Sequence, residues 1–302
     1  MKSHSAIVLG LSLAFFHLAL SSSCAEILVK SGEKIAFMGD SITGQGWGNP
    51  VGYVHLVMAG LEANGVKAEA VPRGVSGHKS DQMLARLQKD VISRKPQWMT
   101  LSCGVNDVWH RAKGVPLDDA MAANGTYDAN VASRGTFKKN ITEIVDKATA
   151  ANIKVVILTA TGIKEQLDNK ENTQLVPYNE FLRHLARERK IPLADLNAVF
   201  REKIQAANTN KNVLTVDGVH MKAEGNKVMA TGVLKAFGLN DAELAKANEA
   251  WTPMIEKDAA EHQAKARAAA ECRAKAAAEK KAQKKASDGG AAKSATPAPP
   301  AK

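Results

Sequence analysis

Short apolar segments alternate with amphipathic segments over most of this 302-residue chain. Each apolar segment has five or six residues, as buried strands often do, and is followed by apolar residues at helical spacing. We therefore expect strands at 34–38, 67–71, 98–103, 154–159 and 191–196, and helices at 53–63, 80–93, 137–151, 176–190, 198–207 and 224–237. This alternation predicts an α/β protein in which helices cover both faces of a parallel sheet.

The first 25 residues do not follow this pattern. A short polar start, an apolar run over 6–20 and small residues up to Ala25 predict a signal peptide at 1–25 and an exported, periplasmic or extracellular protein. The apolar run is shorter than the about 20 residues of a membrane-spanning helix. Cys24 would be the anchor of a lipoprotein, but Ser21 stands where a lipobox has an aliphatic residue, so we favour cleavage without a lipid anchor.

The other end of the chain also changes in composition. Residues 241–286 are rich in Ala, Lys and Glu, and the segment Lys265–Glu271 is nearly repeated at Arg273–Glu279. From Lys265 to Ala286 the segment lacks large apolar residues, and its high helix propensity predicts a solvated helical extension. Residues 287–302 contain Gly-Gly and Pro-Ala-Pro-Pro, which predicts a disordered tail. One globular domain then remains at 26–240.

The positive charge of the chain lies largely in this extension. The whole sequence has a net charge of +10, but residues 257–302 hold eleven Lys or Arg against five Asp or Glu. The globular part is only mildly basic, so the charge gives no reason to expect nucleic acid as a partner. The extension is interpreted either as a solubilising spacer or as a segment that binds an anionic polymer of the cell envelope.

The three cysteines are far apart, at Cys24, Cys103 and Cys272, and predict neither a disulfide framework nor a zinc site. Cys103 lies in an apolar strand segment and is expected in the core. Two Asp-x-x-His pairs are candidates for a catalytic base and the carboxylate that orients it. They are Asp107 with His110 and Asp217 with His220, and their spacing does not choose between them. A turn or capping Asp beside a surface His is the alternative for each pair.

Ser41 directly follows the first strand and precedes a Gly-rich stretch. A hydroxyl at that position is a candidate nucleophile if a helix begins there, because a helix N-terminus favours developing negative charge. The alternative is a serine that caps the helix. Gly77 could donate a backbone N–H and Asn106 a side-chain N–H to an oxyanion, although each residue type is also common in turns.

Together these motifs resemble the SGNH hydrolases, also described as GDSL-like lipases or acylhydrolases. The resemblance covers 35–237 and rests on four blocks in order: Gly39-Asp40-Ser41, Gly74 to Gly77, Gly104-Val-Asn106-Asp107 and Asp217-Gly-Val-His220. One departure is Pro72, where the family often has Asn at the start of its second block; this residue is not part of the chemistry.

The resemblance implies a three-layer α/β/α sandwich with a five-stranded, parallel, flavodoxin-like sheet. It implies that Ser41 is the nucleophile, His220 the base and Asp217 the carboxylate that orients the base. The oxyanion hole would come from the backbone N–H groups of Ser41 and Gly77 and the side chain of Asn106. Neither a metal nor an organic cofactor is expected for this two-step ester hydrolysis.

The substrate is less defined by the sequence. Trp47, Trp109 and His110 lie beside the first and third blocks, where the tryptophans either line a pocket or pack in the core or at its rim. Compact, exported members of the family often remove acetyl groups from carbohydrate, so we expect a short-chain, acetyl-specific serine esterase. The alternatives are a lysophospholipase, thioesterase or arylesterase of the same fold, and a non-enzymatic envelope-binding protein.

Overall fold

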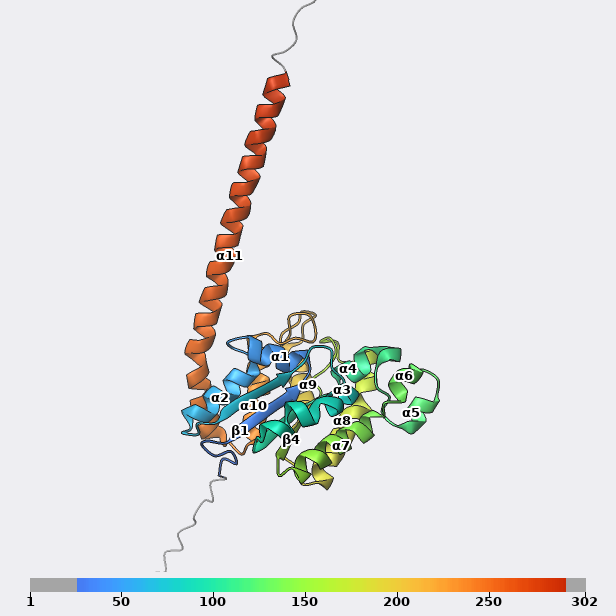
Figure 1. The fold of residues 1–302 in the computed structure, drawn as a ribbon. Coiled ribbons are helices and arrows are strands. Elements are labelled where there is room, and N and C mark those ends of the chain that lie inside the picture. Colours follow the sequence, from blue (N-terminus) through green and yellow to red (C-terminus); the bar gives the residue numbers. More distant parts are fainter. Residues whose placement is uncertain (1–25, 292–302) are drawn as a thin grey trace, which may run out of the picture.

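The computed structural model describes residues 26–291, so the predicted signal peptide and residues 292–302 lie outside the described residues. Five strands form one parallel sheet in the order β2-β1-β3-β4-β5 (Figure 1). This is the strand order of flavodoxin-like folds, and it confirms the predicted architecture. The strands are β1 (Lys34–Gly39), β2 (Glu69–Gly74), β3 (Trp98–Ser102), β4 (Lys154–Leu158) and β5 (Leu193–Ala194).

Helices cover both faces of the sheet and complete three layers (Figure 1). On one face, α2 (Tyr53–Ala63) and α10 (Ala223–Ala236) pack against each other, with α9 (Leu196–Ala207) beside α10. On the other face lie α3 (Ser80–Asp90), α7 (Phe137–Ala150) and α8 (Lys170–Glu188). The central strands are buried from both sides, which explains why their sequences are continuously apolar instead of alternating.

Two elements differ most from their predicted positions. The second strand is β2 at Glu69–Gly74 and includes Pro72, which the prediction left outside it. Proline is tolerated there because β2 is an edge strand, paired only with β1, and a missing N–H on its open side costs no ladder hydrogen bond. Helix α8 begins at Lys170, six residues before its predicted start, and the side chain of Asn169 caps it. Its first residues are largely polar and show no helical periodicity.

Short helices at the strand ends were not predicted. They are α1 (Ser41–Gly48), α4 (Val105–Trp109), α5 (Asp119–Ala123) and α6 (Ala129–Ala132). The first two follow β1 and β3 directly, so they start at the carboxyl edge of the sheet. Segments of four to eight residues contain only one or two helical turns, which is too few for an apolar periodicity to stand out.

The last helix, α11 (Asp241–Ala291), corrects the predicted domain boundary. Its first turns pack against α2, where Leu244 and Trp251 are buried and Ile255 is partly buried against the core. The globular domain therefore continues to Ile255 and does not end at residue 240. The prediction failed because a few apolar residues, spaced on one helix face, are diluted in a long Ala-rich segment.

Beyond this docked part, α11 projects away from the globular domain (Figure 1). Every residue from Ala259 to Lys281 is exposed. The helix runs to Ala291, five residues past the predicted end at Ala286, so residues 287–291 are helical where disorder was expected. Extending a helix that has already formed is much easier than starting one, which lets it continue into residues of weak propensity.

Candidate active site

Ser41 is the first residue of α1 and stands at the carboxyl end of β1. The capping role belongs to its neighbour: the Asp40 carboxylate accepts a hydrogen bond from the Ile42 N–H at 2.9 Å. The sharp turn from strand to helix also requires Gly39, since a Cβ there would lie 2.1 Å from Oγ1 of Thr43. The Ser41 hydroxyl is thus left available at the N-terminus of α1.

Three side chains far apart in sequence form one hydrogen-bonded row. Oγ of Ser41 lies 2.9 Å from Nε2 of His220, and Nδ1 of His220 lies 2.7 Å from Oδ2 of Asp217. An ionised carboxylate can only accept, so Nδ1 carries the proton and Nε2 accepts from the Ser41 hydroxyl. This is the arrangement in which an imidazole can take the proton of a serine during attack.

The carboxylate of Asp217 is fixed by its own loop. Its Oδ1 accepts from the backbone N–H groups of Val219 at 3.0 Å and His220 at 2.8 Å. Partial burial raises the pKa of Asp217, but the hydrogen bonds from the His220 ring and these two N–H groups outweigh it and lower the pKa to about 2. Asp217 is therefore ionised throughout the neutral range and keeps the imidazole in one orientation.

Glu165 holds this loop from the other side, and sequence reasoning missed it. Its carboxylate accepts from the backbone N–H groups of Val213, Leu214 and Thr215 and from the Thr215 hydroxyl, at 2.6 to 2.9 Å. The same hydroxyl oxygen accepts from the N–H of Gly218 at 3.1 Å, inside the Asp217–His220 turn. Glu165 stands in a polar loop after β4, where no motif or periodicity distinguishes it.

The predicted oxyanion donors lie at three neighbouring strand ends. The structure gives no acceptor within the described chain for the backbone N–H groups of Ser41 and Gly77, and Gly77 has a φ of +76° that favours glycine. The Asn106 side chain is 5% exposed and donates to Asp40 Oδ2 at 3.3 Å and to the carbonyl of His78 at 3.2 Å. Asp40 therefore orients the Asn106 amide next to the Ser41 turn.

The second Asp-x-x-His pair does not form within the described structure. Asp107 is fully buried and accepts from the N–H and hydroxyl of Ser80 at 3.0 and 2.6 Å and from the Cys103 thiol at 3.4 Å, whereas His110 is exposed. Burial raises the pKa of Asp107 to about 6 despite the bonds from Ser80. Cys103, expected in the core, is 3% exposed.

The two tryptophans beside the site are on the surface. Trp47, on α1, is 40% exposed and stacks on the ring of His55 at 4.3 Å, while Trp109, at the end of α4, is 37% exposed. Core packing is therefore excluded for both. The two helices that carry them, α1 and α4, both start at the carboxyl edge of the sheet, where Ser41 stands.

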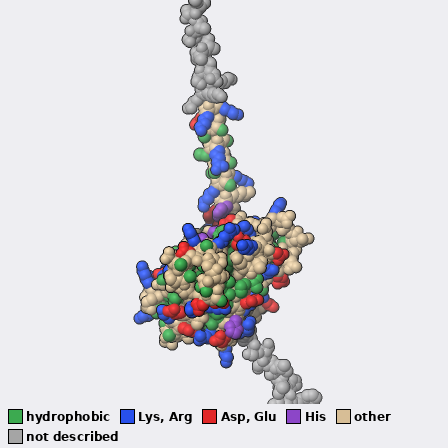
Figure 2. Space-filling view, turned by 90° about the vertical axis from the view of Figure 1, so that its right-hand side faces the viewer, with side chains coloured by type: hydrophobic (Ala, Val, Ile, Leu, Met, Phe, Trp, Pro, Cys, Tyr) green, Lys and Arg blue, Asp and Glu red, His purple; other side chains and the backbone are tan. Residues whose placement is uncertain are grey.

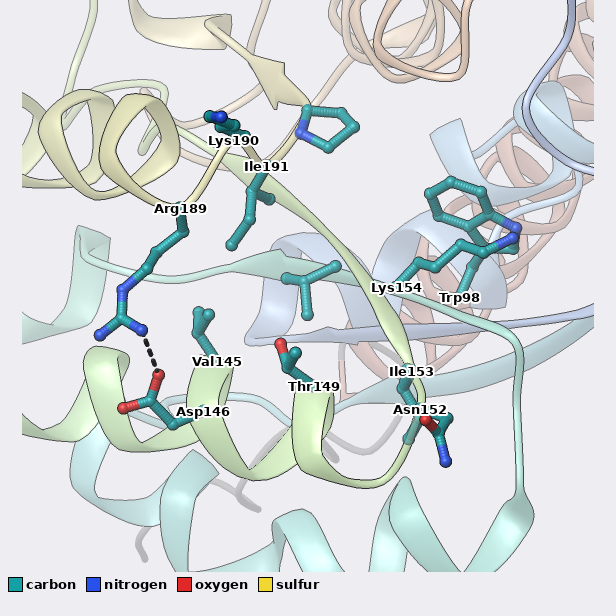
Figure 3. A pocket seen from close by; sticks show the side chains of 12 residues that line it. Trp98, Val145, Asp146, Thr149, Asn152, Ile153, Lys154, Arg189, Lys190 and Ile191 are labelled. Atoms are coloured by element: carbon teal, nitrogen blue, oxygen red, sulfur yellow. Dashed lines mark ion pairs between the residues drawn. The ribbon is translucent and has the colours of Figure 1, made fainter.

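The largest cavity described, about 800 Å³, lies at the opposite end of the sheet (Figure 3). Trp98 and Lys154, at the starts of β3 and β4, line it, and the ion pair of Arg189 with Asp146 at 3.1 Å crosses its edge. None of the residues around Ser41 contributes to it. A second cavity, of about 510 Å³, lies at the carboxyl edge, where Gly162 follows β4 and Asn197 follows β5.

In residues 26–291, no helix combines the length and the apolar character needed to cross a membrane. The same residues contain no group of three or more His, Cys, Asp or Glu side chains arranged to hold a metal ion.

Comparison with known proteins identifies one matching family and several similar enzymes. A model of the GDSL-like Lipase/Acylhydrolase family matches residues 37–228. An acetylxylan esterase from Geobacillus stearothermophilus is 26% identical over 222 residues, which is 70% of this chain and 96% of that protein. A crystal structure of an acetyl xylan esterase is 31% identical, covers 67% of this chain and 98% of its own, and superposes with a TM-score of 0.56. An α/β hydrolase enzyme from the metagenome of Lake Arreo, 24% identical with a TM-score of 0.57, shares the fold over 70% of this chain and 98% of its own.

Proposed function

The chain belongs to the GDSL-like lipase/acylhydrolase family and is a carboxylic ester hydrolase, and from this premise we propose that it removes acetyl groups from carbohydrate. Ser41 is the nucleophile, His220 the base and Asp217 the carboxylate that orients it. The observation that supports this assignment is the row of two hydrogen bonds, 2.9 and 2.7 Å long, from Ser41 through His220 to Asp217.

The reaction proceeds in two steps. His220 Nε2 accepts the hydroxyl proton as Ser41 Oγ attacks the ester carbonyl. The backbone N–H groups of Ser41 and Gly77 stabilise the oxyanion, together with the Asn106 amide, which gives up one of its two acceptors, Asp40 or the His78 carbonyl, to do so. Collapse of this intermediate expels the sugar alkoxide, which takes the proton from His220, and leaves an acetyl-Ser41 ester. Water, deprotonated by His220, then attacks that ester, and the departing Ser41 oxygen takes the proton back from His220 as acetate is released.

Two features favour a sugar ester over other esters of the same fold. Two of the relatives named above are acetylxylan esterases. In addition, the exposed indoles of Trp47 and Trp109 offer flat apolar surfaces beside the site, and exposed aromatic rings with a polar rim are common in binding sites. A lysophospholipase, thioesterase or arylesterase remains the alternative enzyme, and a non-catalytic envelope-binding protein is the alternative outside enzymes.

Hydrolysis of acetylated xylo-oligosaccharides and of p-nitrophenyl esters of increasing chain length tests this proposal. We expect turnover of the acetylated sugars, a steep decline beyond short acyl groups, and a loss of about 10⁴-fold or more in kcat for Ser41→Ala. Activity that rises with chain length would favour a lipase. Retained turnover by folded Ser41→Ala, or no labelling of Ser41 by a fluorophosphonate, would refute the nucleophile.

We propose that the basic part of α11 binds an anionic polymer of the cell envelope. The exposed stretch carries Lys265, Arg267, Arg273 and Lys275, and Lys and Arg side chains stand out along the projecting helix (Figure 2). Binding should weaken steeply with salt. Deletion of the residues beyond Ala259 leaves the docked turns of α11 in place, and unchanged polymer binding by that variant would leave α11 only the role of a spacer.

We also propose that the protein is exported after cleavage before Glu26. The amino-terminal sequence of the protein recovered from the periplasm or the medium tests this directly. Retention in the cytoplasm with residues 1–25 attached would contradict the proposal. A lipid on Cys24 would mean that the exported protein is anchored to a membrane and does not begin at Glu26.

A further inference from the structure

The cavity of about 510 Å³ at the carboxyl edge of the sheet lies on the same edge as Ser41. Thr161 and Gly162, which follow β4, and Asn197, which follows β5, form its floor, and residues of α8 and α9 form its sides. Its volume is within the range of about 300–1,000 Å³ that is typical of small-molecule sites. A polysaccharide laid across this edge of the sheet would therefore pass both Ser41 and the cavity.

The cavity wall is fixed against the catalytic loop. Lys164 lines the cavity, and its Cα would lie 2.8 Å from a Cβ added to Gly218, in the Asp217–His220 turn. The next residue, Glu165, binds three consecutive N–H groups of the same loop. The cavity and the catalytic side chains are thus held at one distance from each other.

Three cationic side chains line this cavity: Lys164, Arg183 and Arg201. Arg183 is neutralised by two hydrogen bonds to the Asp195 carboxylate, at 2.8 and 2.9 Å. Within the described chain, Lys164 has no ion pair, and the side chain of Arg201 donates to the Leu167 carbonyl at 3.1 Å without pairing to an acid. Glu171 lies within electrostatic range of Lys164, but its carboxylate forms an ion pair with Arg111 at 3.1 Å. One acid, Glu202, lines the cavity.

The rest of the wall suits a sugar ring. Thr161 is 6% exposed, and its hydroxyl has no hydrogen-bond partner in the described structure. Because that oxygen is closed off from solvent, a ligand hydroxyl could pair with it only after the side chain turns toward the cavity. Leu167, Val176 and Ile204 supply an apolar surface, which a pyranose ring can cover and a free phosphate ion cannot.

We propose that this cavity, defined by Thr161, Lys164, Arg183 and Arg201, binds a carboxylate-bearing sugar unit, a uronic acid residue, of the carbohydrate whose acetyl group Ser41 removes. The inference rests on the proposed function, because it adds a subsite to the same substrate. Lys164 and Arg201 bind the carboxylate, and the apolar side chains contact the ring. The enzyme then acts preferentially on acidic stretches of an acetylated polysaccharide.

The backbone conformation of Lys164 indicates that substitution by glycine should leave the fold intact. Its φ is +61°, in the left-handed region that glycine adopts without strain. Lys164→Gly removes the ammonium group and relieves this strain, so its melting temperature should equal or exceed that of the wild type. Lost binding in this variant then cannot be attributed to unfolding.

The test measures binding by titration calorimetry to Ser41→Ala, so that turnover plays no part. Two ligands are compared: an acetylated xylo-oligosaccharide that carries one uronic acid, and the same molecule with that carboxyl reduced to an alcohol. We expect the acidic ligand to bind about tenfold tighter, as partly exposed charge-assisted contacts allow. Lys164→Gly and Arg201→Gln, each added to Ser41→Ala, should each weaken this preference, and the two together should abolish it. Lys190→Gln, beside the cavity at the opposite end of the sheet, should leave it intact.

Equal affinity for the two ligands, or an unchanged preference in both cavity variants, would overturn the proposal. A further arm compares a free uronic acid with a sugar phosphate, and tighter binding of the phosphate would overturn the assignment of a carboxylate. Failure of the proposed function is visible separately, as a lack of turnover of the neutral acetylated ligand by the wild-type enzyme.

Discussion

His220 and His110 illustrate how three-dimensional position separates two residues with the same local spacing. His220 contacts both Ser41 and Asp217, whereas His110 lies exposed at the end of α4 and Asp107 points into the core. We expect His220→Ala to lower kcat by about 10⁴-fold or more and His110→Ala to lower it by less than tenfold. Steady-state kinetics on p-nitrophenyl acetate compares the two. A larger loss at His110 would mean that the base has been misassigned.

The buried carboxyl of Asp107 predicts a pH-dependent stability. Burial raises its pKa to about 6 from an ordinary value near 4, so the folded protein binds a proton more tightly than the unfolded chain. This contribution to stability is fully present below about pH 4 and is lost as the pH rises through about 6. Relative to the wild type, Asp107→Asn should gain up to about 3 kcal/mol over that interval.

Chemical denaturation at a series of pH values from 4 to 7 measures this effect. Asn has the same shape as Asp and can still accept from Ser80, so the packing is preserved. Asp119→Asn, on α5 with a side chain that is 72% exposed, serves as the control for removing a carboxylate at the surface. If the difference between wild type and Asp107→Asn does not change with pH, the buried carboxyl does not titrate in this interval.

At the residue scale, the family resemblance of four motifs together, and not the spacing of any one of them, predicted Ser41, His220 and Asp217 as the catalytic residues. The structure places these three side chains in one hydrogen-bonded row. The roles of Asp40, which orients Asn106, and of Glu165 were not predictable. Each acts through hydrogen bonds to groups that are close only after folding, such as the Asn106 amide, 66 positions from Asp40 in sequence.

Glu165 links the loop after β4 to the catalytic loop and gives a prediction at the scale of elements. Removing its carboxylate leaves the N–H groups of Val213, Leu214 and Thr215 without an acceptor and frees the turn that holds His220. A displacement of about 1 Å at a catalytic group can cost about 10²-fold in rate. We therefore expect Glu165→Ala to lower kcat by about that factor and to change KM little.

Chemical rescue separates this positioning role from a general loss of stability. Formate can occupy the space left in Glu165→Ala and accept the same hydrogen bonds, so it should restore part of kcat without raising the melting temperature by the same degree. The kcat of Glu165→Gln, which keeps one acceptor oxygen, should lie between that of the wild type and that of Glu165→Ala. An equal loss of kcat in Glu143→Ala, an exposed carboxylate on α7, would show that the effect is not specific to the loop contact.

Among the elements, those with long periodic patterns were predicted well. The central strands β1, β3 and β4 and the helices α2, α3 and α7 begin at their predicted residues. The edge strand β2 and the first turns of α8 were misplaced because their positions depend on tertiary pairing and on capping by Asn169, which an apolar pattern does not reveal. The wrong predictions therefore concern segments that are stabilised mainly by contacts with other parts of the fold and little by their own sequence pattern.

The whole molecule consists of a catalytic domain and a projecting helix that is anchored by one side chain above all. Trp251 of α11 is 0% exposed, and its Nε1 donates to the Leu56 carbonyl of α2 at 2.7 Å. Its ring also packs close to Gly60, where an added Cβ would lie 3.5 Å from Cζ2. The first turns of α11 are thus part of the domain core, while the segment beyond Ala259 contributes no buried residue that the structure describes.

This division predicts two different outcomes from changes to the same helix. Trp251→Ala creates a cavity and leaves the Leu56 carbonyl without its side-chain donor, so the free energy of unfolding should fall by about 3–5 kcal/mol. Deletion of residues 260–302 removes far more of the chain, yet it should change the unfolding free energy and kcat on a small ester by little. Denaturant titration of both variants measures the contrast. A large loss of stability on deletion would mean that the projecting segment folds back onto the domain, because an isolated solvated helix makes no contact from which the domain could gain stability.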